Sequence, residues 1–302
     1  MGAQWERALA GELRARHGDD PEDLHKMRVA IRRLRAARRV FRIALQRAAG
    51  GDVLAPFDDD LRHLARVLGA VRDLDVAIDA LRRYTATAPI ADQEALSRLE
   101  GDWQERRAAA GANLQATLDA EPMARLRDQF AATLAALAAS PAEPTGGHTP
   151  KRLEQAAPRL LRKALRRFRR RGRRLFVPTE AELHRFRIEA KRLRYTAEFL
   201  EPALGEGIRP LIELSNAIQD ALGAAHDADV AITSLLGEVE RLASIPDRAA
   251  DAGTLARLIR HYNSHRAEGL AHFREAWPQV PKPAAALRRL RHARSEAHGP
   301  TE

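Results

Sequence analysis

Apolar residues recur along this chain every three or four positions, a spacing that places them on one face of an α-helix. Breaks that contain proline or glycine interrupt the pattern and mark the helix ends. Because β-branched runs are nearly absent, we expect an all-α fold with little or no sheet. The predicted helices are 3–17, 21–48, 55–85, 90–120, 122–140, 151–175, 179–203, 208–240, 249–277 and 283–296.

One break is much longer than the others. The stretch 140–150, SPAEPTGGHTP, holds three prolines and two glycines, so a helix cannot continue through it. We therefore predict a first helical bundle at 1–140, a linker at 141–150 and a second helical bundle at 151–302.

The two predicted bundles repeat each other. Segment 23–35, DLHKMRVAIRRLR, aligns without gaps with segment 182–194, ELHRFRIEAKRLR. Segment 68–81, LGAVRDLDVAIDAL, aligns with segment 222–235, LGAAHDADVAITSL, and nine positions of that stretch are identical. The order of the motifs predicts two bundles of similar topology that face each other across a pseudo-twofold axis. Fainter matched pairs are Arg7 with Arg166, Arg14 with Arg173, Trp103 with Tyr262, and Arg107 with Arg266.

On a helical wheel, the first motif and its continuation place cations on one stripe, with Met27, Ala30 and Leu34 across from it. Like charges at these spacings repel by a few tenths of a kcal/mol per pair, and we expect no acid four positions along to offset them. A bound anion would neutralise such a stripe, since arginine donates two hydrogen bonds to a phosphate and a phosphate raises the pKa of a neighbouring histidine. The stripe holds His25, Arg28, Arg32, Arg35 and Arg39, and its counterpart holds His184, Arg187, Lys191 and Arg194.

A charged run on a helix is more often a solvated face, and a histidine in the first turns of a helix is more often a capping or core residue. Repetition of the stripe in both halves favours the binding interpretation. A denser cationic run follows the linker, and we expect only one side of it to line a ligand channel, with Arg7 and Arg14 in the matching role in the first half. That side holds Arg159, Arg162, Arg166, Arg170 and Arg173.

The second motif mixes signs, with Arg72 or His226 followed by two aspartates. Paired acids suggest a metal site or a general acid, but positions two apart on a helix point in different directions. The alternative is that these aspartates cap a helix or hold neighbouring arginines in place. Gly69 and Gly223 in the same motif are expected to permit close helix approach.

Composition narrows the classes of function. The 302 residues carry 51 Lys and Arg against 41 Asp and Glu, a formal net charge of +10, so the surface should attract anions. No cysteine is present, which excludes disulfides, thiolate nucleophiles and zinc–thiolate sites. The first residues do not read as a secretory leader, and the longest apolar stretch is too short to span a bilayer. We expect a soluble, cytoplasmic protein with no membrane partner.

The doubled histidine–arginine motif together with the doubled LG-x-x-[RH]-D-x-D-V motif resembles the CHAD domain, the conserved histidine α-helical domain, over nearly the whole chain. The resemblance implies two four-helix-bundle-like halves related by pseudo-twofold symmetry around a basic central pore or cleft. It also implies binding of inorganic polyphosphate and association with polyphosphate granules. The chain departs from the family's pattern at His226, where arginine is usual. The family's histidines and basic positions fall on His25, His184, Arg28, Arg32, Arg35, Arg187, Lys191 and Arg194.

We therefore predict a non-catalytic polyphosphate-binding protein without cofactor or metal. Other polyanions are alternative ligands. A nucleic-acid-binding protein is one competing hypothesis, although no aromatic side chains interleave the basic stripes. A metal-dependent phosphohydrolase is another, although no carboxylates stand at a convincing spacing beside the stripes. The candidate polyphosphate-binding residues are His25, Arg28, Arg32, Arg35, Arg39, His184, Arg187, Lys191, Arg194, Arg7, Arg14, Arg166, Arg173, Arg72 and His226.

Overall fold

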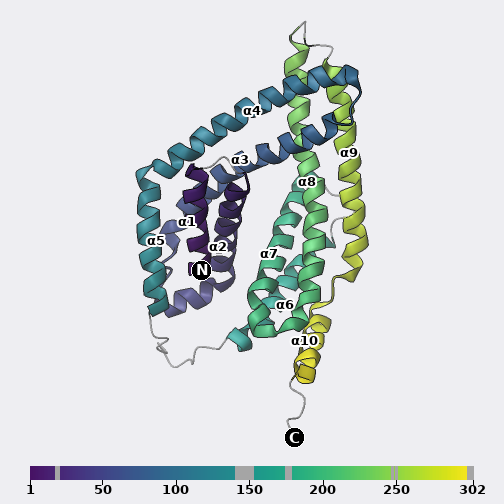
Figure 1. Cartoon of the computed structure of the whole chain (residues 1–302). Coiled ribbons are helices and arrows are strands. Elements are labelled where there is room, and N and C mark those ends of the chain that lie inside the picture. The colour runs from purple at the N-terminus through teal and green to yellow at the C-terminus, as the bar shows by residue number, and fades with distance from the viewer. Residues whose placement is uncertain (18–20, 140–152, 174–178, 246–247, 249–250, 298–302) are drawn as a thin grey trace. The chain divides into compact units, whose positions relative to one another are not determined.

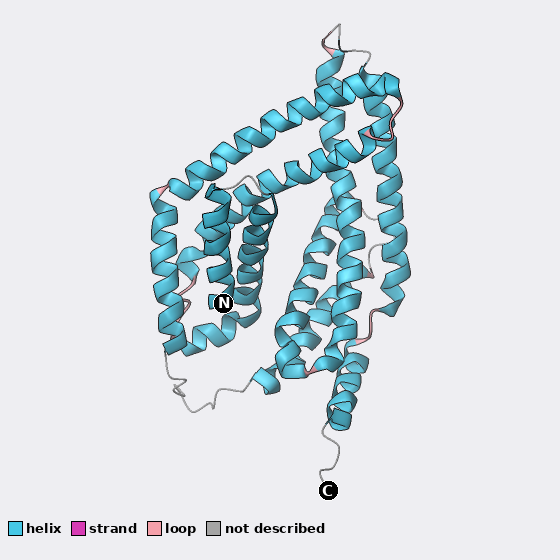
Figure 2. Ribbon diagram, in the orientation of Figure 1, coloured by secondary structure: helices cyan, strands magenta, loops and turns pink. Residues whose placement is uncertain are grey.

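The computed structural model describes residues 1–17, 21–139, 153–173, 179–245, 248 and 251–297. These residues form ten α-helices and no β-strand, so the all-α prediction is confirmed (Figure 2). The predicted linker at 141–150 lies outside the described residues, as do the ends of the predicted helices at 151–152, 174–175 and 249–250. No helix within the described ranges is long and apolar enough to cross a lipid bilayer.

The chain divides into two compact units, 1–149 and 150–302. The first unit contains α1 (Gly2–His17), α2 (Pro21–Ala48), η1 (Ala55–Phe57), α3 (Asp58–Thr85), α4 (Ile90–Asp119) and α5 (Glu121–Ala139) (Figure 1). The second unit contains α6 (Leu153–Gly172), α7 (Glu180–Leu204), η2 (Glu206–Ile208), α8 (Arg209–Ala243), α9 (Asp251–Ala276), η4 (Trp277–Gln279) and α10 (Pro283–Ala297).

The same helix pairs recur in both units. In the first unit α1 packs on α2 and α3 packs on α4, while in the second unit α6 packs on α7 and α8 packs on α9. The second helix of each unit also contacts the third, and the fifth contacts the first. Each unit is therefore two helical hairpins with one further helix, and a short 3₁₀ helix precedes α3 and α8 at corresponding places.

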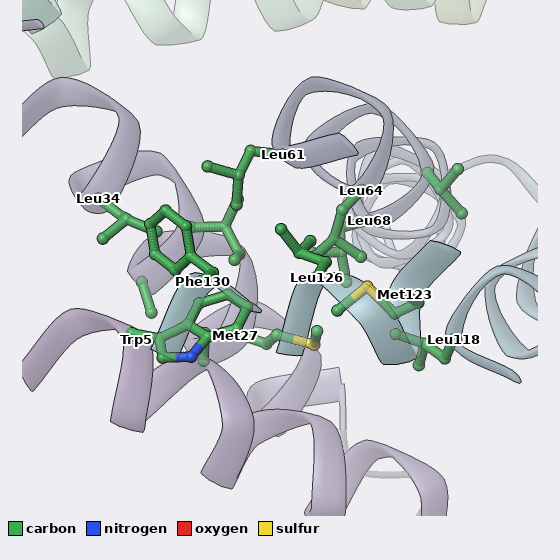
Figure 3. Packing of buried hydrophobic residues seen from close by; sticks show 14 of the residues in the cluster. Trp5, Met27, Leu34, Leu61, Leu64, Leu68, Leu118, Met123, Leu126 and Phe130 are labelled. Carbon is green, nitrogen blue, oxygen red and sulfur yellow. The ribbon is translucent and has the colours of Figure 1, made fainter. Parts of the chain in front are cut away.

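The core of the first unit lies between α1, α2, α3, α4 and α5 (Figure 3). Met27, Ala30 and Leu34 are at most 2% exposed, which confirms the predicted apolar side of the first motif helix. The ring of Phe130 lies edge-on to Trp5 and to Phe57, with centroids 4.8 and 5.1 Å apart. Burying side chains of this size stabilises the unit by about 1.5–3 kcal/mol each.

Aromatic rings fill the corresponding place in the second unit. Phe168 on α6 stacks on Phe186 of α7 at 4.8 Å, and Trp277 lies edge-on to both at 5.5 and 5.7 Å. Gly172 makes room for the indole, because a Cβ built there would lie 2.1 Å from a ring carbon of Trp277. The end of α6 therefore depends on a residue without a side chain.

The close helix approaches are not at the glycines that the sequence indicated. A Cβ at Gly69 or Gly223 would meet nothing within 4 Å among the described residues, so that expectation was wrong. One tight contact is at Gly269 on α9, where a Cβ would lie 2.8 Å from the carbonyl oxygen of Ala221 and 3.0 Å from the amide nitrogen of Ala225 on α8. Backbone atoms cannot move aside as a flexible side chain can, so α8 and α9 need a glycine here.

Candidate functional site

The two motif helices, α2 and α7, begin with different but equally firm signals. Thr179 caps α7: its hydroxyl accepts from the Glu182 amide at 3.3 Å, and its own amide donates to the Glu182 carboxylate at 3.0 Å. Pro21 opens α2, where its fixed φ suits the first turn, and two acids follow it. His25 and His184 are each the fifth residue of their helix, so both lie in its first two turns.

The first unit brings four predicted residues together, named here the first basic cluster: His25, Arg28 and Arg32 from α2 and Arg72 from α3. Burial lowers the pKa of His25, and the positive charges of Arg72, Arg32 and Arg28 lower it further, against an opposing effect of Glu22. The Nδ1 atom of His25 is buried and has no hydrogen-bond partner among the described residues. A neutral imidazole thus sits among three permanent cations.

The second unit repeats this arrangement in a second basic cluster: His184, Arg187 and Lys191 from α7 and His226 from α8. The rings of His184 and His226 lie with their centroids 5.0 Å apart. Burial lowers the pKa of His226, and the charge of Arg187 lowers it further, as do His184 and Lys191 to a smaller extent, while Asp227 opposes them. Each member occupies the position that the repeat assigns to its counterpart in the first cluster.

The first aspartate of each second motif pairs with the first arginine of the cluster. Arg28 donates to Asp73 at 3.2 Å, and Arg187 lies 3.7 Å from Asp227. The carboxylates are largely exposed, at 67% and 57%, whereas the two arginines are mostly covered. An exposed carboxylate holds its arginine only weakly against water and salt, so an incoming anion can compete for the guanidinium.

The second aspartate of each motif is buried and pairs across to the next helix. Arg107 of α4 donates to Asp75 at 3.0 Å, and Arg266 of α9 donates to Asp229 at 2.5 Å. Of the two alternatives left open for these acids, capping or holding arginines, the second is confirmed. The faint sequence match between Arg107 and Arg266 is thus a structural repeat, and so is that of Trp103 with Tyr262, both of which are buried.

Several predicted residues have other surroundings. Arg35 lies near Arg62 and Asp58, and burial, followed by the charge of Arg62, lowers its pKa. Arg194 donates to Glu198 at 2.7 Å, so the expectation that the stripes have no acid four positions along was wrong. Arg14 donates to Asp23 at 2.8 Å. The remaining predicted residues are exposed: Arg7, Arg39, Arg166 and Arg173.

Sequence reasoning missed one buried acid near the second motif helix. Glu189 of α7 is 4% exposed and accepts from Arg192 at 2.5 Å, and Arg167 of α6 lies 2.8 Å from it. One arginine of the dense run on α6 therefore fastens α6 to α7. The spacing of three between Glu189 and Arg192 was the available signal. Among the described residues, no three His, Cys, Asp or Glu side chains gather as ligands of a metal ion would.

Solved structures, but no curated protein sequences, are similar to this chain. Comparison with curated protein sequences finds no match. The crystal structure of the CHAD domain from the plant Ricinus communis is 26% identical with a TM-score of 0.66, and the match covers 89% of each chain. PptA from Streptomyces chartreusis shares the fold at 17% identity with a TM-score of 0.65, over 92% of this chain and 96% of that one.

The CHAD domain family matches residues 1–236, a range that includes both copies of each motif and both basic clusters. More than half of the chain is covered by that match, and the solved CHAD domain has the same fold. This chain belongs to the CHAD domain family.

Proposed function

We propose that this protein binds inorganic polyphosphate through its two basic clusters and does not hydrolyse it. The observation that carries the proposal is the repetition of one arrangement in both units: a histidine, two cations on the same helix, and a fourth basic residue from the neighbouring helix. A charged face that only contacts solvent is not expected to recur with the same neighbouring residues and the same supporting aspartates.

The chemistry of the clusters suits a chain of phosphates. Arginine presents a planar fork of donors to phosphate oxygens and stays charged, and a histidine held neutral by its neighbours gains a proton when a phosphate approaches. The lowered pKa values of His25 and His226 arise partly from the positive charges beside them, which a bound polyanion would offset. Neither cluster, as defined by its four residues, includes a Phe, Tyr or Trp ring on which a base could stack, which favours polyphosphate over nucleic acid.

The non-catalytic part of the proposal is supported by how the motif acids are used. Asp75 and Asp229 are buried and are engaged by arginines of the next helix. A general base or a metal ligand has to be available to a substrate or an ion. In the cell, binding of this kind, together with the family membership, supports a place at polyphosphate granules in the cytoplasm.

The test is a polyphosphate binding isotherm on the whole chain, comparing wild type with Arg28→Glu/Arg187→Glu. The matched control is Arg83→Glu/Arg274→Glu, which changes the net charge equally at exposed positions of α3 and α9. We expect the first variant to lose at least about a hundredfold in affinity and the control to lose much less. Circular dichroism should show that both variants keep their helices; equal losses in both would overturn the site.

Two further measurements separate the competing functions. At matched salt, double-stranded DNA or RNA should compete poorly with polyphosphate; better binding of nucleic acid would favour a nucleic-acid-binding protein. Incubation with polyphosphate and Mg²⁺ or Mn²⁺ should release no phosphate above the rate without protein. Sustained turnover that Arg28→Glu/Arg187→Glu abolishes would make the protein a phosphohydrolase.

A further inference from the structure

Helix α9 carries a second pair of histidines, outside the residues that the family match covers. His261 and His265 are one helical turn apart, and their Nε2 atoms lie 3.1 Å from each other. The two rings meet edge-on, with centroids 4.4 Å apart. Neither basic cluster contains these two histidines.

A carboxylate orients one of the rings. Glu268 lies one turn beyond His265, and its Oε2 is 3.2 Å from the Nδ1 of that histidine. A proton on Nδ1 shared with the carboxylate leaves Nε2 of His265 with a free lone pair, directed at His261. Carboxylates behind ligating histidines play this role in metal sites, where they fix the tautomer and increase the basicity of the ring.

The separation of the two nitrogens fits one metal ion bound by both. A metal ion bonded to each Nε2 at about 2.05 Å would make an N–metal–N angle of about 98° across this gap. That angle is close to the about 90° between neighbouring ligands of a square-planar or octahedral ion, such as Cu²⁺ or Ni²⁺. Small rotations of the two rings would suffice, because both ligands stand on one helix.

The acid beside His265 also suits a cation. The other close pair of histidines, His184 and His226, lies among Arg187 and Lys191, which repel a metal ion. His265 has an acid beside it instead, and the side chains of His265 and Glu268 are 51% and 63% exposed, so an ion can reach them.

We propose that His261 and His265 chelate a divalent transition-metal ion of the Ni²⁺ or Cu²⁺ type through their Nε2 atoms, with Glu268 orienting His265. Without metal, the two rings share a hydrogen bond. With metal, His261 carries its proton on Nδ1, and water completes the coordination of the ion. The site is independent of the proposed polyphosphate site, since no residue is common to both.

The test is calorimetric titration of the full chain with Ni²⁺ alone in a buffer that does not chelate metals. We expect His261→Ala and His265→Ala each to weaken the tightest Ni²⁺ site at least about tenfold, and Glu268→Gln to weaken it by several-fold to about tenfold. The control is His272→Ala, an exposed histidine on the same helix, which should leave the affinity unchanged. Ni²⁺ should also raise the thermal unfolding midpoint of wild type but not of His265→Ala.

Three results would overturn the proposal. His265→Ala could bind Ni²⁺ as tightly as wild type, with its helices intact by circular dichroism. His272→Ala could weaken binding as much as His265→Ala does, which would place the ion elsewhere on α9. His226→Ala, in place of His265→Ala, could remove the tightest site, which would assign the metal to the other pair of histidines.

Discussion

The two basic clusters differ at one position in a way that changes their chemistry. Where the first cluster has Arg72, the second has His226. The first cluster therefore joins three permanent cations to one histidine, and the second joins two permanent cations to two histidines. The charge of the second cluster therefore depends more strongly on pH than the charge of the first cluster.

The supports of the two clusters are alike, whereas the packing behind them is not. Each buried motif aspartate is held by an arginine from the next helix, Arg107 or Arg266. Gly269 lets α9 come close to α8 over Ala221 and Ala225, but the repeat places Val67, Val71 and Ala110 at these positions in the first unit. The arginine partners of Asp75 and Asp229 are thus preserved although the hairpins that carry them are packed differently.

The largest effect should come from removing the supporting arginines. Arg107→Ala or Arg266→Ala leaves a buried carboxylate without its partner, and we expect a loss of about 2 kcal/mol in the unit concerned, moderated because both arginines are partly exposed. Hydrogen exchange resolved by helix should show faster exchange in α3 and α4 for Arg107→Ala, and in α8 and α9 for Arg266→Ala. Arg83→Ala is the exposed control. Unchanged protection in α3 and α4 or in α8 and α9 would mean that the pair concerned does not support its cluster.

The hairpin packing should give the next largest effect. Gly269→Ala places a methyl group against the backbone of α8, and we expect a loss of about 1–2 kcal/mol in thermal or urea unfolding. Gly223→Ala meets open space and should stabilise its helix by up to about 1 kcal/mol, because alanine is the better helix former. Equal effects of the two substitutions would contradict the close approach at Gly269.

A smaller effect should appear in the pH dependence of polyphosphate binding. Burial and the charge of Arg187 lower the pKa of His226 in the free protein, and a bound phosphate would raise it. Binding would therefore take up a proton. Affinity should then rise as the pH falls from the pKa of the bound form to that of the free form. His226→Arg should flatten the change between about pH 8 and pH 6 by about threefold, and Arg72→His should steepen it by a similar factor. Isotherms at constant ionic strength measure both, and the reverse order would contradict the comparison of the clusters.

The smallest effect should follow from the exposed aspartates. Asp73→Asn and Asp227→Asn each remove an internal competitor for the cluster arginine, so we expect polyphosphate to bind about twofold to threefold more tightly. The gain should be larger for Asp73→Asn, because the Arg28–Asp73 distance of 3.2 Å is shorter than the 3.7 Å between Arg187 and Asp227. Weaker binding of both variants would show that these carboxylates position the arginines for the ligand.

The spacing of apolar residues was sufficient to predict the helices. Met27, Ala30 and Leu34 are buried, as expected for residues on the side of α2 opposite the stripe of cations. The partners of Asp75 and Asp229 could not be chosen from the sequence, because Arg107 and Arg266 come from another helix and only the fold brings them near. Glu198 stands four positions after Arg194, so the sequence spacing is sufficient to predict this ion pair. The expectation of a close helix approach at Gly69 was wrong because a glycine in a sequence does not indicate whether its position on the helix faces a neighbouring helix. The linker, the domain boundaries and the pseudo-twofold axis stay predictions.

Trp277, whose ring lies against Gly172, also makes the second unit optically distinct. The other two tryptophans, Trp5 and Trp103, belong to the first unit. With both replaced by phenylalanine, the remaining indole emission would come from the aromatic cluster around α6, α7 and α9. Its wavelength and quenching would then follow the melting of the second unit alone, while the first unit stays silent in the same spectrum.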